Sequence, residues 1–183
     1  MPREFSLIST KLELGLCKNK KKVLAGNWCY QDNDKKNSHN YLIVNNIWSN
    51  PKVFNNDYKY IKNLLNRSIN SLVNYLNKIH KKKFSKKFWK ILILPWLTIY
   101  LPAYYYRWSV VKQILKIKKN IDFYNLENLK DEFVPLDSYD FHKNIQNRQD
   151  FNYFIFRKII FFLNIKNKIK IKKKFYKKNF FSK

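Results

Sequence analysis

The sequence predicts a helix-rich α/β fold, in which one or two short strands near the N-terminus are followed by packed helices. The apolar run Val23–Ala25 ends at one of only two glycines and indicates a buried strand. Apolar residues at helical spacing between Asn56 and His80 indicate a long amphipathic helix. The 183 residues are 45% hydrophobic, which suffices for the core of one domain or of part of a larger one.

Both strands are expected in the first quarter of the chain. Val23–Gly26 reads as a strand followed by a turn at Asn27–Cys29, and Tyr41–Val44 is a second, less distinct strand candidate. The polar stretch Gln31–Asn40 between them predicts a loop, and Lys18–Lys22 predicts a solvated turn.

Three helices are expected in the middle of the chain. Asn56 or Asp57 is placed to cap the first, which runs to about His80 with one apolar and one polar face. The third runs from Ala103 to Lys118, with lysines near the C-terminal end, where the helix dipole favours them. The apolar face of the first helix comprises Ile61, Leu64, Leu65, Ile69, Leu72, Val73, Leu76 and Ile79.

The second helix opens the most distinctive block of the sequence, residues 80–108, which combines tryptophans and prolines in one apolar run. Ser85 is placed to cap this helix. Pro95 lies well inside it and should kink or end it, so we expect a buried helix pair broken at Pro95 and Pro102. The residues expected to face inward are Phe88, Trp89, Leu92 and Ile93.

The same block has some features of a membrane span. Phe88–Tyr106 approaches the ~20 residues that a span needs, and prolines and aromatic residues are tolerated there. The apolar core between Lys90 and the tyrosines Tyr104–Tyr106 is too short, which favours a soluble, buried helix pair. A membrane-associated protein with Phe88–Tyr106 at or in the bilayer, on an anionic leaflet for example, stays open as a third interpretation.

Charge is unevenly distributed along the chain. Residues 58–121 contain fifteen Lys and Arg and no acid, whereas residues 122–150 contain seven acids. The acidic stretch either lies against the basic one within the fold, or both are solvated. Asp137 and Asp150 stand where N-caps are wanted, and we expect capping rather than catalysis from both. The two capped helices would span Tyr139–Gln146 and Phe151–Asn164.

The net charge of +26 and the pI near 10 make nucleic acid an alternative partner. Only five of the 38 basic residues are arginines. Because Arg binds phosphates and bases bidentately and Lys is a point charge, a nucleic-acid-binding protein gains from Arg. AT-rich codons supply Lys, Asn, Ile, Phe and Tyr, so drift tolerated on a solvated surface explains much of the charge. The alternative function is a basic ribosome-associated or organellar protein.

The C-terminal segment 164–183 has nine lysines and no acid, and its apolar residues give no clean period. We expect this segment to be a basic tail that is disordered or forms a frayed helix.

No complete catalytic constellation is visible, so the catalytic residues stay unknown. His39, His80 and His142 lack metal-ligand spacing, and no metal site is expected. With two glycines in all, Gly-rich phosphate loops and dinucleotide fingerprints are missing, and no cofactor is evident. Cys17 and Cys29 form neither a zinc motif nor a disulfide framework, which indicates a reducing cytoplasm.

Three side chains each have a chemical and a structural interpretation. Cys29 follows a strand end, where nucleophiles occur, but a lone Cys near a core is more often a small hydrophobe. His80 ends a helix on its apolar side and is expected to pack or cap. Arg107 stands between Tyr106 and Trp108, where it binds an anionic group or packs on the aromatic rings as a surface arginine.

Several segments resemble, in order, those of one protein family. Ser9–Glu13 is similar to an opening segment in which a Thr-rich turn precedes a Leu-Glu pair. Val23–Cys29 is similar to a strand ending in Gly-Glu-Trp-Cys, and Phe88–Leu97 to an aromatic-Trp and Gly-Pro-Trp-Leu run. Leu76–His80 is similar to a helix end that carries a histidine, and Tyr106–Trp108 is similar to a segment with tyrosine and arginine. Two weaker matches are Phe133–Pro135 and Asp150–Leu163.

The family comprises bacterial transferases associated with surface-polysaccharide (O-antigen) gene clusters, and the resemblance covers residues 6–163 as its N-terminal part. It implies transfer of a glycosyl or related activated group in surface polysaccharide biosynthesis. It also implies a nucleotide-sugar donor, an activated sugar or lipid-linked acceptor, and a cytoplasmic location peripheral to the inner membrane face. Since the family's proteins are longer, we expect an incomplete domain and a truncated form of an architecture with two nucleotide-binding folds.

Two departures from the family's pattern stand out: Asn27 replaces an acid, and Leu94 replaces a glycine. The candidate ligand or phosphate contacts are Asn27, Trp28, His80 and Arg107. A basic surface rich in aromatic residues suits a diphosphate donor or an anionic membrane surface, because aromatics stack on sugars and bases while Lys and Arg neutralise phosphates.

Overall fold

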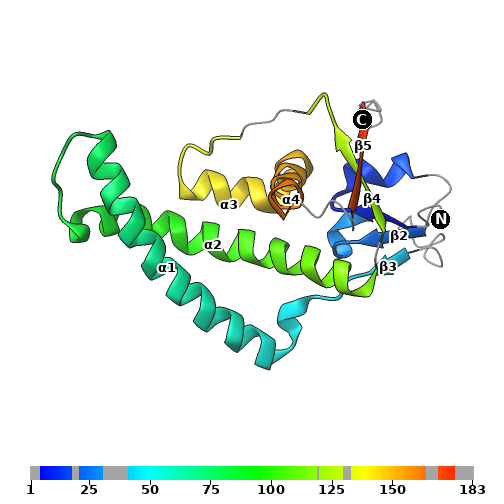
Figure 1. Ribbon diagram of the computed structural model, residues 1–183, viewed down its shortest axis with the longest axis horizontal. Coiled ribbons are helices and arrows are strands. Elements are labelled where there is room, and N and C mark those ends of the chain that lie inside the picture. Colours follow the sequence, from blue (N-terminus) through cyan, green and yellow to red (C-terminus); the bar gives the residue numbers. More distant parts are fainter. Residues whose placement is uncertain are drawn as a thin grey trace. The chain divides into compact units, whose positions relative to one another are not determined.

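The computed structural model describes residues 5–17, 21–30, 41–118, 120–129, 133–163 and 169–175 (Figure 1). The chain divides into two compact units. Unit 1 comprises residues 1–46, 107–134 and 147–183, and unit 2 comprises residues 47–106 and 135–146. The loop expected at 31–40, His39, residues 18–20 of the expected turn, and residues 164–168 and 176–183 of the expected tail lie outside the described residues.

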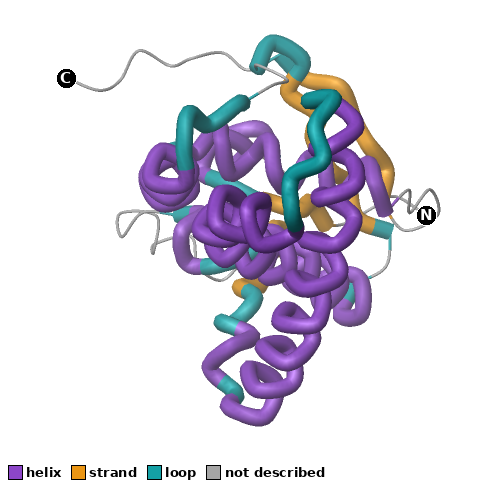
Figure 2. Tube along the Cα trace, turned by 90° about the vertical axis from the view of Figure 1, so that its left-hand side faces the viewer, coloured by secondary structure: helices purple, strands orange, loops and turns teal. Residues whose placement is uncertain are grey.

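Unit 1 contains a five-stranded sheet in which every neighbouring pair is parallel, with the strand order β3-β2-β1-β4-β5. Together with the helices that make up most of the described chain (Figure 2), this sheet confirms the helix-rich α/β class. The sheet is larger than the one or two strands expected from the sequence. Its strands are β1 (Phe5–Ile8), β2 (Lys21–Leu24), β3 (Tyr41–Ile43), β4 (Ile121–Leu126) and β5 (Ile169–Lys174).

The predicted strands at Val23 and Tyr41 are confirmed as β2 and β3, whereas β1 and β4 were not predicted. Both missed strands lie in the middle of the sheet and are buried on both faces, as in other parallel sheets. Each carries polar residues that interrupt its apolar run, Ser6 in β1 and Asp122 in β4. Asp122 is buried, and its carboxylate forms an ion pair with the Lys172 ammonium at 2.8 Å.

The expectation of disorder or frayed helix is wrong for residues 169–174, which form β5. Ile169 and Ile171 alternate with lysines at the two-residue period of a strand, and β5 pairs with β4 from Ile169↔Ile121 onward. Lys172 and Lys173 bind Asp122 and Glu127, each at 2.8 Å. Part of the acidic stretch therefore lies against the basic C-terminal segment, and lysines on an edge strand also discourage pairing with other chains.

Helix α4 (Gln149–Leu163) packs on β4 within unit 1 through a buried tyrosine. The Tyr153 hydroxyl donates to the carbonyl oxygen of Tyr124 and accepts from the Leu126 N–H, both at 2.8 Å, while its ring stacks on Phe123. The expected N-cap at Asp150 is wrong: α4 already begins at Gln149, and Asp150 lies in the first turn, where it pairs with Arg148.

Replacing Tyr153 with phenylalanine is expected to lower the free energy of unfolding by about 2 kcal/mol, because it leaves a buried N–H without its acceptor and removes a donor from a buried carbonyl. Urea titration measures the loss. Tyr139→Phe is the matched control, since that side chain is exposed and should change stability by less than about 0.5 kcal/mol. Equal stabilities for the two variants would contradict this role of Tyr153.

Unit 2 consists mainly of two long helices, α1 (Pro51–Ile79) and the greater part of α2 (Lys86–Ile117), together with α3 (Ser138–Asn147). The amphipathic helix ending near His80 is confirmed, but its expected caps are wrong. Asn50 caps α1 by accepting from the N–H groups of Lys52 and Val53, with Pro51 in the first position. Asp57 instead accepts from the Trp48 indole and the Tyr105 hydroxyl, at 2.9 and 2.8 Å.

The caps predicted for α2 and α3 are confirmed. The Ser85 hydroxyl accepts from Phe88 N–H at 3.2 Å at the start of α2. Asp137 precedes α3 and accepts from Asp140 N–H at 2.7 Å, so the capping role predicted for it is confirmed.

The expected break at the prolines is wrong, because α2 continues through Pro95 and Pro102 and includes the helix expected from Ala103. The carbonyls that lose their helical partners belong to Ile91 and Thr98, both exposed, so water can satisfy them. The expected inward face is also partly wrong, since Trp89 is buried whereas Phe88 and Leu92 are exposed. Among the described residues, no helix is both long enough and apolar enough to cross a membrane.

Candidate functional site

The candidate site lies in unit 1, where β1 and β2 end. Parallel strands place their carboxyl ends along one edge of the sheet, and ligands of open α/β sheets bind outside that edge, where the strand order reverses. Here the chain runs outward from β1 through β2 to β3 and then returns to β4 on the other side of β1. The segments at this edge, which we call the carboxyl edge, are Ser9–Leu16 after β1 and Ala25–Tyr30 after β2.

Hydrogen bonds hold these two segments against each other. The carbonyl oxygen of Ile8 accepts from Ala25 N–H at 2.9 Å and from the Cys29 thiol at 3.4 Å. The Trp28 indole N–H donates to the carbonyl oxygen of Ser9 at 3.1 Å. Consequently, the two N-terminal segments that carry the family resemblance, Ser9–Glu13 and Val23–Cys29, meet at the carboxyl edge.

Glu13 is fully buried beneath the turn that follows β1. Its Oε2 accepts from the N–H groups of Ser9 and Thr10, at 2.8 and 2.9 Å, and from the Ser9 hydroxyl at 2.5 Å. Among the residues that the structure describes, none forms a hydrogen bond with its Oε1. Desolvation by burial outweighs these hydrogen bonds and raises the pKa of Glu13 to about 7.

Glu13 therefore has two properties that the sequence analysis did not assign to it. It shapes the turn by closing a capping box with Thr10, and a carboxyl with a pKa near neutrality can hold or release a proton at physiological pH. The available signal was the Thr-x-x-Glu spacing of Thr10 and Glu13, which is typical of a capping box.

Asn27 and Trp28, two of the predicted contacts, lie together after β2. The Asn27 side chain is exposed and Trp28 is half-buried. Gly26 permits this arrangement, because a Cβ added there would come within 2.1 Å of the Trp28 ring. The backbone at Gly26 is extended, so close packing of the indole, rather than strain, requires glycine.

The carboxyl edge is also tied to α4 and to the end of β4. Lys11 N–H donates to the Gln149 side-chain oxygen at 3.1 Å, which joins the turn after β1 to the start of α4. Glu127, directly after β4, pairs with Lys173, and its N–H donates to the carbonyl oxygen of Lys174 at 3.0 Å. The ends of β1, β2 and β4 are thus each fixed by specific polar contacts.

The other two predicted contacts lie elsewhere. Arg107 belongs to unit 1, where its guanidinium donates to the side-chain oxygen of Asn152 on α4. His80 belongs to unit 2, where it ends α1 and its ring lies 5.4 Å from that of Trp89. The packing or capping role expected for His80 agrees with these contacts, and ligand binding by either residue stays a prediction.

Cys29 does not have the properties of a nucleophile. The thiol is fully buried, and desolvation raises its pKa to about 12, so almost none of it is thiolate at neutral pH. Burial likewise raises the pKa of the Cys17 thiol. Within the part of the chain that the structure describes, no three His, Cys, Asp or Glu side chains gather as metal ligands would.

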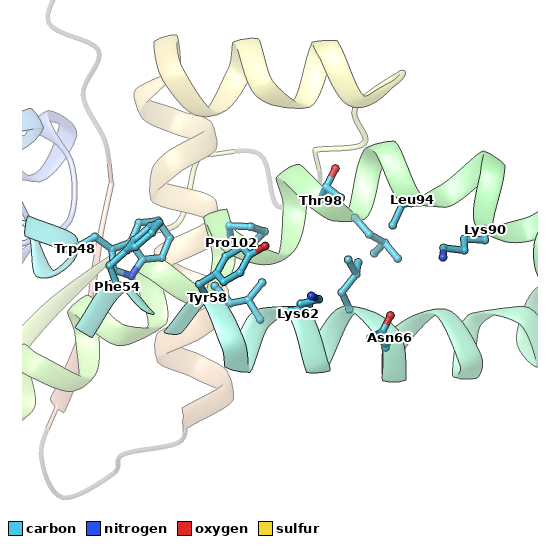
Figure 3. A pocket seen from close by; sticks show the side chains of 12 residues that line it. Trp48, Phe54, Tyr58, Lys62, Asn66, Lys90, Leu94, Thr98 and Pro102 are labelled. Atoms are coloured by element: carbon cyan, nitrogen blue, oxygen red, sulfur yellow. The ribbon is translucent and has the colours of Figure 1, made fainter. Parts of the chain in front are cut away.

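Unit 2 contains a separate cavity of about 550 Å³ between α1 and α2 (Figure 3). Leu94 forms part of its wall. Lys62 and Lys90 bring positive charge to the cavity from the two facing helices, and none of the lining residues is acidic. The remaining lining residues are mainly apolar: Trp48, Phe54, Tyr58, Ile61, Leu65, Asn66, Leu97, Thr98 and Pro102.

These features define the class of protein: an α/β protein with an open parallel sheet. The family model of the LIC12162 family transferases matches residues 5–183. The chain therefore belongs to the LIC12162 family of transferases, and the match includes the basic segment after residue 163. Comparison with curated proteins gives no match, and comparison with solved structures gives none either.

Proposed function

We propose that this transferase moves a glycosyl or related activated group from a nucleotide-sugar donor, bound at the carboxyl edge, during assembly of a bacterial surface polysaccharide. One observation carries the proposal: two separate family segments, Ser9–Glu13 and Val23–Cys29, meet at the carboxyl edge beside the point where the strand order reverses. Membership of a transferase family supplies the reaction type.

The residues at the carboxyl edge suit the parts of such a donor. The half-buried Trp28 ring offers an aromatic surface for a base or a sugar, and Lys11 offers a positive charge for a diphosphate. The exposed Asn27 amide can donate to and accept from sugar hydroxyls. Glu13 holds the turn in position beneath these groups.

The cavity of unit 2 suits the apolar part of a lipid-linked acceptor. Its walls are mainly apolar, which favours an isoprenoid or acyl chain, while Lys62 and Lys90 favour a phosphate on that chain. In this proposal the protein works in the cytoplasm, where nucleotide sugars are made, and meets its acceptor at the inner membrane face.

Titration calorimetry with UDP-, GDP-, dTDP- and CMP-linked sugars tests the proposal. At least one should bind with a dissociation constant between about 1 µM and 1 mM, the usual range for enzyme substrates. The corresponding free sugar should bind far more weakly, because it lacks the nucleotide. Failure of every nucleotide sugar to bind at millimolar concentration would contradict the proposal.

Restoring the family's acid is expected to raise turnover of the bound donor. Asn27→Glu should increase the rate of donor hydrolysis or transfer by about 100-fold, the usual contribution of a general acid or base, with little change in donor affinity. Asn27→Gln is the matched control and should leave the rate unchanged. Equal rates for the two variants would mean that the family's acid has no chemical role at this position.

A further inference from the structure

Exposed apolar and basic side chains gather around the turn between α1 and α2 in unit 2. We call residues 75–92, which include the end of α1, the turn and the start of α2, the hairpin tip (Figure 1). None of its polar side chains is acidic. Its apolar and basic residues are interspersed along the chain.

A network around Asn77 fixes the conformation of the hairpin tip. The Asn77 side-chain oxygen accepts from Phe84 N–H at 3.0 Å and from the Trp89 indole at 2.8 Å, and its amide donates to the carbonyl oxygen of Phe84 at 3.0 Å. Lys81 adopts a φ of 51°, which ends α1 in the left-handed conformation typical of helix ends. The exposed side chains are therefore presented by a defined scaffold.

The apolar side chains of the hairpin tip form a stripe on the exposed side of α2. Phe88, Ile91 and Leu92 have the spacing of one helix face, and the Phe84 ring packs against the Phe88 ring in a tilted arrangement with centroids 4.3 Å apart. Ile91 is 65% exposed and Leu92 57% exposed, while Trp89 on the other side is buried. Single exposed apolar residues are ordinary, but a contiguous series of this kind marks an interaction surface.

Positive charge surrounds this stripe. The six lysines of the turn and the start of α2 lie within a stretch, residues 58–121, that contains no acid at all. The partner must therefore combine an apolar layer with a dense negative charge. These lysines are Lys81, Lys82, Lys83, Lys86, Lys87 and Lys90.

We propose that the hairpin tip docks on the surface of a membrane that contains anionic phospholipids. The stripe enters the boundary between headgroups and acyl chains, and the surrounding lysines contact the lipid phosphates. Nucleic acid fits less well, because aliphatic side chains such as Ile91 and Leu92 gain little from a phosphate backbone. The proposal concerns unit 2 alone and does not depend on the donor at the carboxyl edge.

Co-sedimentation of the full chain with vesicles tests the docking. Binding to phosphatidylcholine vesicles should rise steeply when phosphatidylglycerol is included and should fall with added salt. Lys81→Glu/Lys82→Glu/Lys83→Glu should lower the partition coefficient at least about 100-fold, since each lysine near an anionic surface contributes about fivefold. Ile91→Ser/Leu92→Ser should lower it about tenfold while preserving the salt dependence.

A matched charge control separates the hairpin tip from the net charge of the protein. Lys116→Glu/Lys143→Glu/Lys170→Glu alters three exposed lysines outside the hairpin tip and changes the net charge by the same amount as the tip variant. Its affinity for vesicles should stay within a few-fold of that of the unaltered protein. Circular dichroism verifies that each variant is folded. An equal loss in this control, or vesicle binding that ignores lipid charge, would overturn the proposal. The proposal would also be overturned if the substitutions at Lys81, Lys82 and Lys83 lowered the affinity for single-stranded RNA but not the affinity for vesicles.

Discussion

Glu13→Ala is expected to produce the largest loss of stability, about 3 kcal/mol or more. The substitution leaves the buried N–H groups of Ser9 and Thr10 and the Ser9 hydroxyl without their shared acceptor. Each buried donor that loses its partner costs about 1–3 kcal/mol, and a small cavity adds to the loss. Urea titration measures the effect, and a loss below about 1 kcal/mol would contradict the role of Glu13 beneath the turn.

The raised pKa of Glu13 also predicts the sign of a pH dependence. Its pKa is about 7 in the fold and near 4.5 in the unfolded chain, so between these values the folded protein holds more protons. The contribution of Glu13 to the free energy of unfolding is therefore greatest below about pH 4.5 and falls by about 3 kcal/mol as the pH rises through 7.

Glu13→Gln isolates this dependence, because glutamine retains an acceptor for Ser9 and Thr10 and does not titrate. The difference in unfolding free energy between the unaltered protein and this variant should decrease by about 3 kcal/mol from pH 4 to pH 8. Taking the difference cancels the contributions of other titrating groups. A difference that stays constant, or increases with pH, would show that Glu13 is not held in the buried state described here.

Gly26→Ala is expected to have the largest effect on ligand binding. The added Cβ would lie 2.1 Å from the Trp28 ring, so the indole must move and its hydrogen bond to Ser9 must break. Donor affinity should fall at least about tenfold, as expected for the loss of a positioned aromatic surface worth about 1–3 kcal/mol. Calorimetry with the nucleotide sugar that binds the unaltered protein measures this loss.

Gly15→Ala is the matched control, because a Cβ at Gly15 has no atom within 4 Å. It should bind the donor as tightly as the unaltered protein does. If the two alanine variants bind the donor equally well, then Trp28 does not form part of the binding surface, although the carboxyl edge could still contain the donor.

The sequence predicted elements whose signal is local and missed those that depend on distant partners. Val23–Ala25 is a continuous apolar run, and α1 has apolar residues at helical spacing, so each element can be recognised from its own residues. β4 contains Asp122, which is tolerated at the centre of the sheet because Lys172, fifty residues further on, pairs with it. β5 itself is stabilised by its backbone pairing with β4, which its lysine-rich composition does not reveal.

The prolines of α2 illustrate a second reason. Pro95 and Pro102 each remove one helical hydrogen bond, and from sequence alone the expected consequence is a break. Whether the helix ends depends on what satisfies the freed carbonyls. Ile91 and Thr98 are both exposed in the fold, so water can satisfy their carbonyls.

Asn27 and Trp28 lie in the turn that the sequence predicted after β2, and their role as ligand contacts stays a prediction. The importance of Glu13 became visible only when its burial was known. Arg107 and His80 were grouped with them on residue type, since a guanidinium, an imidazole and an indole all suit anionic ligands. Residue type does not reveal that Arg107 is held by Asn152 or that His80 lies in another unit.

Hydrogen–deuterium exchange with and without the tightest-binding nucleotide sugar tests most directly whether the carboxyl edge binds the donor. We expect slower exchange in peptides covering Ser9–Leu16 and Ala25–Tyr30, because a ligand at the carboxyl edge stabilises the turns after β1 and β2. Peptides from the hairpin tip should exchange at unchanged rates. Protection confined to unit 2, or none in either segment of the carboxyl edge when the donor is saturating, would contradict this assignment.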